Sequence, residues 1–414
     1  MLVTIKLKHE KDGWAVEDMA EELEELAVTC GASILDNIAC AIEKPTPNFF
    51  IGRGKAQEIS FLAQELEADT VIFSRDLSGT QQRNLEEVIG KKTIDRTQLI
   101  LDIFARHARS PVGKMQVELA QLEYLLPRLI GKGLILSRTG GGIGTSGPGE
   151  QRLEIDRRRI RKKIDKLRSD LDSYSTHRDT ARKKRKDNAL PQVAFVGYTN
   201  AGKSTLLNAL TGSSQVVADS LFTTLDTLSK NLELPNGEHV ILCDTVGFLD
   251  NLPHHLVESF KATLEEVTQA DLLVHVLDAS HPKIHEHSRS VFEVLKQLGA
   301  DEKPVITALN KIDAVEDKGA VEILRNGFQE AVLISAKTKE NLDLLLGRIE
   351  QSFAARMRYL EIVIPHSHIG LIDLFYREGK VRQIDYLQQG IEVKLTLPVI
   401  LAEKLLSDKK VKLL

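Results

Sequence analysis

The stretch Gly197-Tyr198-Thr199-Asn200-Ala201-Gly202-Lys203-Ser204 decides the fold of this chain. It follows the apolar run 193–196, which predicts a strand, and continues through Thr205 into 206–210, which predicts a helix. A strand, the pattern G-x-x-x-x-G-K-S and a helix in this order indicate a phosphate-binding loop; a glycine-rich turn before a helix is the simpler alternative. Glycines let backbone N–H groups point at phosphate oxygens, and the helix N-terminus adds positive partial charge. We expect Lys203 to reach the β- and γ-phosphates and the Ser204 hydroxyl to ligate Mg²⁺.

Length and composition indicate the number of domains and the class of protein. A length of 414 residues predicts two or three domains, and 42% hydrophobic with 28% charged residues is typical of a soluble globular protein. No apolar stretch is long enough to span a membrane, and no signal segment begins the sequence. Cys30, Cys40 and Cys243 have neither disulfide nor metal-ligand spacing, so we expect a reduced, cytoplasmic compartment.

Charge is distributed unevenly. Residues 151–187 hold 15 lysines and arginines against 7 acidic residues, in a chain whose net charge is −4. A basic block in an acidic protein favours a polyanionic partner, most simply nucleic acid. A solvated helix face is the alternative.

The expected fold class is α/β. In the N-terminal domain, 1–110, strands and helices alternate, which predicts a small parallel sheet flanked by helices. The predicted strands are 2–7, 33–39, 70–73 and 92–95, and the predicted helices are 16–28, 55–67 and 79–89. The segment 50–55 lacks a full nucleotide fingerprint and is interpreted as a tight strand-to-helix turn.

Two heptad patterns predict an antiparallel helical hairpin over 111–190. The apolar positions are Met115, Leu119, Leu122, Leu126 and Leu129 in one segment, and Ile160, Ile164, Leu167, Leu171 and Tyr174 in the other. Pro127 predicts that the first helix kinks or ends near Leu126, and Pro148 reads as a helix stop. The connection, 131–149, contains eight glycines among nineteen residues.

This glycine-rich tip is longer than an ordinary connector, which favours function or disorder. Glycines beside a cation would let the backbone approach RNA closely, so Arg138, Gly141 and Gly142 are the candidate RNA contacts here. The later run Lys183-Lys184-Arg185 is a candidate phosphate-backbone contact; a linker or a targeting signal is the alternative.

Two motifs after the phosphate loop complete a GTPase domain with a parallel sheet, predicted over 191–356. Asp244-Thr245-Val246-Gly247 ends a buried strand, so that Asp244 can hold the Mg²⁺ shell and the Gly247 N–H can sense the γ-phosphate. Asn310-Lys311-Ile312-Asp313 identifies the base, because the Asp313 carboxylate can accept two hydrogen bonds from guanine and not from adenine. Ser335-Ala336-Lys337 is expected to complete the guanine pocket.

Between these motifs lies the switch segment, with Phe222-Thr223-Thr224-Leu225-Asp226 as nucleotide-binding candidates. A threonine here can give its hydroxyl to Mg²⁺ and its N–H to the γ-phosphate, and Thr223 and Thr224 compete for this role. Beyond the GTPase domain, 357–414 predicts a small α/β domain with strands 358–364, 383–386 and 391–397, a helix 368–375 and a polar tail.

The order of these motifs resembles the HflX family of ribosome-associated GTPases, in the translation-factor-related class. The similarity includes Ile94-Asp95-Arg96-Thr97, the run 113–122, the glycine-rich segments 140–144 and 147–150, the phosphate loop and Asp244-Thr245-Val246-Gly247-Phe248. The resemblance implies GTP hydrolysis coupled to the large ribosomal subunit and its RNA, with splitting or rescue of stalled ribosomes. It also assigns the switch threonine to Thr224 and implies that the tip probes ribosomal RNA. Ser146, Gln151 and Thr227 depart from the family pattern.

Lys203, Thr224 and Gly247 are therefore the expected catalytic residues. Phe248 stands where many signalling GTPases carry a glutamine that orients water, which predicts a low intrinsic rate and stimulation by a partner. Asn200 resembles the phosphate-loop asparagine of potassium-stimulated GTPases, so K⁺ is a second candidate cation; a local backbone cap is the alternative.

Two alternatives remain at this point. A switch GTPase that recruits a protein effector without RNA is the competing function, and RNA binding that falls with salt would favour the ribosomal interpretation over it. His281, His285 and His287 lack accompanying metal ligands, so a solvated loop and helix start is the preferred interpretation of these histidines.

Overall fold

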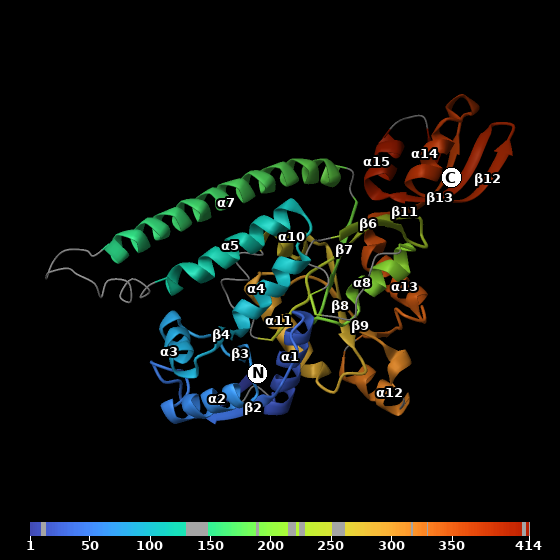
Figure 1. The fold of residues 1–414 in the computed structure, drawn as a ribbon. Helices are drawn as coiled ribbons and strands as arrows, with labels where there is room; N and C mark the ends of the chain where they lie inside the picture. Colours follow the sequence, from blue (N-terminus) through green and yellow to red (C-terminus); the bar gives the residue numbers. More distant parts are fainter. Residues whose placement is uncertain are drawn as a thin grey trace. The chain divides into compact units, whose positions relative to one another are not determined.

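The computed structural model describes residues 1–9, 14–129, 148–187, 190–213, 221–222, 228–250, 261–315, 318–328, 330–407 and 411–413. The chain forms two compact units (Figure 1). The first comprises Met1–Lys184, together with the described residues 221–222, 249–250 and 261–264 from later in the chain. The second comprises Arg185–Val217, Thr227–Phe248 and Glu265–Leu414.

The first unit begins with a parallel four-stranded sheet in the order β2-β1-β3-β4. Its strands are β1 (Leu2–Leu7), β2 (Asn37–Ile42), β3 (Thr70–Phe73) and β4 (Lys92–Asp95). The helices of this part are α1 (Val16–Thr29), α2 (Arg53–Glu65), α3 (Gly79–Ile89) and α4 (Arg96–His107). Apolar residues of β1 and β3 and of α2 and α3 form one core, so the predicted alternation of strands and helices is confirmed.

β2 begins four residues later than predicted, at Asn37 instead of Ser33. The delay has a local cause at the end of α1. Gly31, at φ +77°, and Ala32 donate their N–H groups to the carbonyls of Val28 and Ala27, which closes the helix with a tight backbone turn. Extended structure therefore starts only after this turn.

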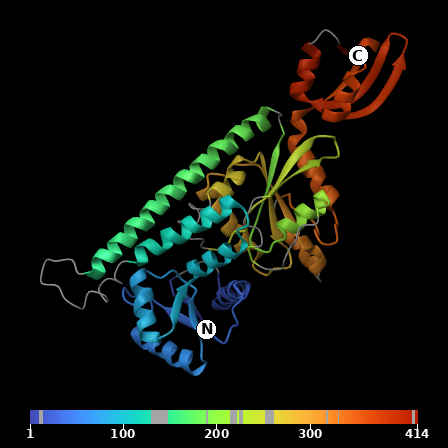
Figure 2. The same ribbon diagram turned by 45° about the horizontal axis from the view of Figure 1, so that its top comes forward.

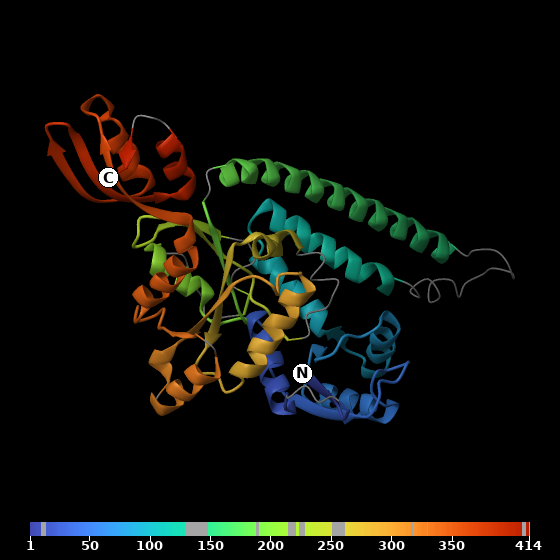
Figure 3. The same cartoon turned by 180° about the vertical axis from the view of Figure 1, so that it is seen from behind.

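The predicted helical hairpin consists of α5 (Pro111–Arg128) and α7 (Pro148–Asp187), which lie side by side in Figures 1 and 3. Leu119, Ile164 and Leu167 are buried between the helices, and other heptad residues pack around them. Tyr174, which belongs to the predicted seam, is instead 45% exposed. Two ion pairs, Lys163–Glu118 and Arg168–Glu123, also join the helices.

The two proline predictions in the hairpin had different outcomes: α5 ends at Arg128, near Leu126 as predicted, whereas the prediction that Pro148 stops a helix was wrong. α5 continues through Pro127 to Arg128, because a proline so near the helix end costs only the hydrogen bond to the Glu123 carbonyl. Pro148 starts α7, since the first residue of a helix has no need of an N–H donor. Most of the tip lies outside the described residues.

The hairpin is attached to the sheet domain through Asp95, a fully buried carboxylate at the end of β4. Asp95 Oδ1 accepts from the Gln98 N–H at 2.9 Å and from the Tyr124 hydroxyl at 2.8 Å. Asp95 Oδ2 accepts from the Leu77 N–H at 3.1 Å and from Arg128 Nη2 at 3.0 Å. Tyr124 and Arg128 belong to α5, so one side chain links this helix to the sheet.

The second unit contains a six-stranded sheet in the order β10-β9-β8-β5-β7-β6, with helices on both faces (Figure 2). Its strands are β5 (Gln192–Val196), β6 (Leu228–Glu233), β7 (His239–Asp244), β8 (Leu272–Asp278), β9 (Val305–Asn310) and β10 (Val332–Leu333). Only β6 is antiparallel to its neighbour. The associated helices are α8 (Lys203–Thr211), α10 (Lys261–Gln269), α11 (Ile284–Gln297), α12 (Lys318–Gly327) and α13 (Leu342–Phe353). The expected GTPase-type parallel sheet is thus present.

The C-terminal part is a four-stranded antiparallel sheet in the order β12-β13-β11-β14. Its elements are β11 (Met357–Ile364), α14 (Leu371–Glu378), β12 (Lys380–Leu387), β13 (Gly390–Pro398), α15 (Val399–Ser407) and β14 (Lys412–Leu413). The predicted polar tail was wrong: Ala402 and Leu405 of α15 enter the core, and β14 pairs with β11. Among the described residues, no helix is both long and apolar enough to cross a membrane.

Candidate nucleotide site

The phosphate loop lies at the carboxyl end of β5, the edge of a parallel sheet where ligands bind. The chain turns through Asn200, at φ +58°, and Gly202, at φ +91°, before α8 starts at Lys203. A Cβ on Gly197 would lie 2.3 Å from the Val276 carbonyl oxygen, so any side chain there would clash with β8. The glycines are therefore required by backbone geometry and by close packing of the loop on the sheet.

Lys203 lies inside this loop and is only 6% exposed. Its Nζ donates to the carbonyl oxygens of Gly197, at 3.1 Å, and Tyr198, at 2.8 Å. Burial lowers the pKa of Lys203 to about 8, and the nearby Asp244 carboxylate opposes this shift. An ammonium held this way lacks a full counter-charge, which the phosphates of a nucleotide would supply.

Ser204 and Asp244 meet beside the lysine, where the sequence predicts Mg²⁺. Ser204 Oγ donates to Asp244 Oδ2 at 2.6 Å, and Asp244 is 1% exposed. A hydroxyl and a carboxylate are hard oxygen donors, the kind that Mg²⁺ prefers. The pair therefore fits a magnesium ion, although Thr224, the other predicted ligand, lies outside the described residues.

The loop after β7 is hydrogen-bonded to the phosphate loop. The Thr199 N–H donates to the Phe248 carbonyl at 2.9 Å, and the Phe248 N–H donates to the Gly197 carbonyl at 3.1 Å. A Cβ on Gly247 would lie 3.2 Å from Lys203 Nζ, so these two predicted catalytic residues are adjacent. The Phe248 side chain is 1% exposed, which leaves it without access to an attacking water.

The predicted base-recognition residues converge from two loops. Asn310 Nδ2 donates to the Ala201 carbonyl, and Asn310 Oδ1 accepts from the Ala336 N–H, both at 2.9 Å. Ser335 Oγ donates to Asp313 Oδ1 at 2.6 Å, which fixes the carboxylate that would read guanine. Asn310 thus ties the base loops to the phosphate loop, as the sequence predicts.

Lys311, at the start of the base loop, adopts φ +63°. Its Nζ forms an ion pair with Asp278 Oδ2 at 2.7 Å, at the end of β8. The ion pair holds the aliphatic stem across the site, where it can cover the plane of a base.

The described structure contains most of the predicted nucleotide-binding residues. These are the loop residues from Gly197 to Thr205, Asp244 to Gly247, Asn310 to Asp313, and Ser335, Ala336 and Lys337. Thr223, Thr224, Leu225 and Asp226 lie outside the described residues, as do Arg138, Gly141 and Gly142. Lys183, Lys184 and Arg185 belong to α7, and only their backbone is described.

Phe222 lies in the first unit, although it was predicted to bind nucleotide. Its ring packs edge-on against Phe104 of α4, with the ring centroids 4.5 Å apart. The residue is 2% exposed, and its backbone adopts φ +57°. Arg96 of the same helix donates to the carbonyl oxygen of Asp250 at 2.7 Å. α4 therefore contacts residues close to both switch segments, one before Thr224 and one after Gly247.

Two buried histidines near the site were not anticipated. The interpretation of His287 as solvated was wrong, because its ring is buried. The ring stacks on that of Tyr198 in the phosphate loop, with the two ring centroids 3.9 Å apart. His275 on β8 is fully buried, and burial, with Lys203 nearby, lowers its pKa to about 3. A single histidine in an apolar strand, or one near the start of a helix, gives no sequence signal for burial. No group of three or more metal-ligating side chains occurs in the part of the chain that the structure describes.

Comparison with known proteins identifies the family of the chain. Three family models match consecutive parts of the chain: "GTP-binding GTPase N-terminal" over 17–105, "GTP-binding GTPase Middle Region" over 107–185 and "50S ribosome-binding GTPase" over 192–311. The GTPase HflX of Caldanaerobacter subterraneus subsp. tengcongensis is 47% identical over 389 residues, which cover 94% of this chain and 90% of the relative. The GTPase HflX of Escherichia coli is 39% identical, with 95% of this chain and 89% of the relative covered.

This chain belongs to the HflX family of GTPases. The resemblance seen in the motifs is confirmed, and GTP hydrolysis is the activity of the chain. A GTP-binding protein from the archaeon Sulfolobus solfataricus in complex with GDP is 26% identical, with a TM-score of 0.43 over 86% of this chain and 99% of that one.

The lowered pKa of Lys203 predicts how GDP affinity depends on pH in this HflX-family protein. Phosphate oxygens favour the charged ammonium, so the bound state retains a proton that the free site releases above about pH 8. Affinity should be constant below that pH and fall by about tenfold per pH unit above it. Calorimetry from about pH 7 to about pH 9 measures this. The Lys203→Arg variant stays charged and corrects for titration of the nucleotide. A wild-type profile as flat as that of the variant would contradict the prediction.

Proposed function

We propose that this GTPase binds the large ribosomal subunit through its RNA, and that GTP hydrolysis accompanies the splitting or rescue of stalled ribosomes. Support comes first from the family model described as a 50S ribosome-binding GTPase, which matches residues 192–311. The protein acts in the cytoplasm in this proposal, because ribosomes are its substrate.

The observation that carries the RNA part of the proposal is the exposed basic face of α7. Arg158 and Arg159 have side chains 71% and 77% exposed, and Arg161, Lys162 and Lys166 are also exposed. Lys163 and Arg168 pair with acids of α5, and Arg158 and Arg159 pair with Glu154 and Asp156 of α7 itself. Among the described residues, Arg161, Lys162 and Lys166 are therefore exposed cations with no ion pair. A row of arginine and lysine on one helix face suits the phosphate backbone of RNA.

The site residues keep the roles proposed from the sequence. Lys203 neutralises charge on the β- and γ-phosphates, Ser204 and Thr224 hold Mg²⁺, and the Gly247 N–H contacts the γ-phosphate. Mg²⁺ supplies further charge neutralisation when bound. Asn200 is the candidate ligand for K⁺. Because Phe248 is buried and apolar, we propose that efficient hydrolysis depends on groups contributed by the ribosome.

Co-sedimentation with ribosomal subunits tests this function. We expect the chain to pellet with large subunits when bound to a non-hydrolysable GTP analogue, and less with GDP or without nucleotide. Large subunits should also raise GTP turnover by about tenfold or more, since transition-state groups supplied in trans have at least this effect. Equal turnover with and without subunits would contradict activation by the ribosome.

A charge-reversal pair tests the role of α7. Arg161→Glu with Lys162→Glu should weaken subunit binding and reduce its salt dependence. Arg289→Glu with Lys296→Glu makes the same charge change on exposed positions of α11 and should leave binding unchanged. Salt-insensitive binding to a protein partner, with no RNA bound, would instead support an effector-recruiting switch.

A further inference from the structure

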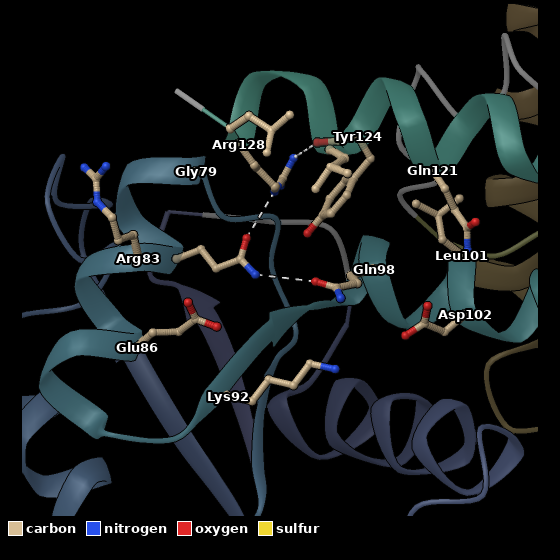
Figure 4. A pocket seen from close by; sticks show the side chains of 13 residues that line it. Gly79, Arg83, Glu86, Lys92, Gln98, Leu101, Asp102, Gln121, Tyr124 and Arg128 are labelled. Atoms are coloured by element: carbon tan, nitrogen blue, oxygen red, sulfur yellow. Dashed lines mark hydrogen bonds between the residues drawn. The ribbon is translucent and has the colours of Figure 1, made fainter. Parts of the chain in front are cut away.

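The first unit contains a pocket of about 410 Å³ between α3, β4, α4 and α5 (Figure 4). The volume lies in the range of small-molecule sites, which begins at about 300 Å³, and would hold one nucleoside. Lys92, Gln98 and Asp102 project into the pocket in Figure 4. Leu129, the last described residue before the glycine-rich tip, also lines it.

Some polar groups of the pocket hold the fold together. Arg128 pairs with Asp95 and also donates to Gln82 Oε1 at 3.2 Å. Gln82 Nε2 in turn donates to the Thr93 carbonyl at 2.9 Å and to Gln98 Oε1 at 3.4 Å. Since Gln98 uses its Oε1 in this contact, its N–H₂ group can still donate to a ligand.

Three other polar groups of the pocket are not held by hydrogen bonds. Among the described residues, Lys92, Asp102 and Gln121 form no hydrogen bond or ion pair, although all three line the pocket. Burial raises the pKa of Asp102, and Lys92 and Arg106 oppose the shift. An ammonium, a carboxylate and a side-chain amide therefore line one cavity, and among the described residues none of the three is held by a hydrogen bond or an ion pair.

This donor and acceptor set matches the Watson–Crick edge of guanine. Guanine presents one acceptor, O6, beside two donors, N1–H and the exocyclic amine. The Asp102 carboxylate can accept both donors while Lys92 donates to O6. Adenine would place its exocyclic amine against the ammonium, so the same groups reject it. Leu101 and Leu125 supply apolar walls for the faces of a base.

We propose that this pocket takes an unpaired guanine base of RNA. The proposal rests on the proposed function, because it assumes an RNA partner. Sequence-specific RNA recognition uses unstacked bases read on this edge. The cavity borders the segment that leads to the glycine-rich tip, so RNA held by the basic face of α7 would have a base-reading site on the same unit.

The test measures binding of short RNA by the full chain, with Asp313→Ala in all samples so that the GTPase site does not read guanine. Labelled five-nucleotide probes carry guanosine, adenosine or inosine between uridines, and fluorescence anisotropy gives their affinities. The guanosine probe should bind about tenfold or more tighter than the adenosine probe. Inosine lacks the exocyclic amine and should lie between them.

Asp102→Asn and, separately, Lys92→Ala should bring the guanosine and adenosine affinities to within about twofold. The readout is the ratio of the guanosine-probe affinity to the adenosine-probe affinity, because loss of an acid strengthens binding to every RNA. Glu87→Gln removes an exposed acid of α3 outside the pocket and should keep the ratio. Equal affinities for the unmodified pocket, or an unchanged ratio in Asp102→Asn, would overturn the proposal.

A competition experiment and a co-sedimentation experiment separate the possible interpretations of guanine binding. Displacement of the probe by micromolar guanosine monophosphate would identify a free nucleotide as the source of the base, whereas displacement by RNA alone supports an RNA ligand. Co-sedimentation of the same variants with large subunits reports the proposed function independently. Loss of guanine preference in every sample with intact subunit binding would reject the pocket alone.

Discussion

Asp313→Asn is expected to lower the affinity for GTP by about 10³-fold and to favour xanthosine triphosphate instead. The carboxylate accepts two donors from guanine, whereas an asparagine amide offers one acceptor and places its N–H₂ group against the guanine amine. Xanthine carries a carbonyl oxygen at that position, so the amide can donate to it. Ser335 Oγ, 2.6 Å from Asp313 Oδ1, can still donate to the asparagine oxygen and hold its orientation.

Steady-state turnover with both nucleotides measures this switch. Asp301→Asn removes an exposed carboxylate from the loop before β9 and should leave the preference for GTP intact. If Asp313→Asn kept the GTP preference of the unmodified chain, the base would have to be read by other residues.

Asp95→Ala is expected to destabilise the first unit by about 3–5 kcal/mol, the effect of breaking a buried, hydrogen-bonded charge pair. The change removes the acceptor for Leu77 N–H, Gln98 N–H and the Tyr124 hydroxyl, and leaves Arg128 without its carboxylate. It therefore removes the cap of α4 and the link to α5 together.

The single tryptophan of the chain, Trp14, makes this measurement specific. It lies in the first unit and is 8% exposed, so its fluorescence during urea unfolding reports that unit and not the GTPase sheet. Asp69→Ala, at an exposed position of the same unit, is the control. A midpoint for Asp95→Ala equal to that of the control would show that the Asp95 contacts contribute little.

The elements best predicted from the sequence are those with strong local signals. The phosphate loop needs Gly197 and Gly202 for reasons of geometry that any chain must satisfy, and both glycines occupy the predicted turn. The hairpin followed from heptad spacing, because Leu119, Ile164 and Leu167 are the residues that such spacing buries. Asn310 followed from its motif and forms the predicted link to the phosphate loop.

The features that were not predicted from the sequence all depend on tertiary contacts. α15 contains a lysine and a glutamate among its apolar residues, and only the sheet formed by β11 and β13 selects Ala402 and Leu405 for burial. The burial of His287 depends on the proximity of Tyr198, 89 positions earlier in the chain. The pocket beside Lys92 depends on four elements that meet only in the folded unit.

The contacts of α4 with Phe222 and Asp250 bear on how the GTPase region can be studied by itself. A truncation that starts near residue 190 would keep Phe222 but remove Phe104, and would keep the Asp250 carbonyl but remove Arg96. The fragment would then expose an aromatic ring and lose a charged donor close to both switch segments. Nucleotide kinetics measured on such a fragment would describe a protein without the contacts of Phe222 and Asp250, and only the intact chain keeps both.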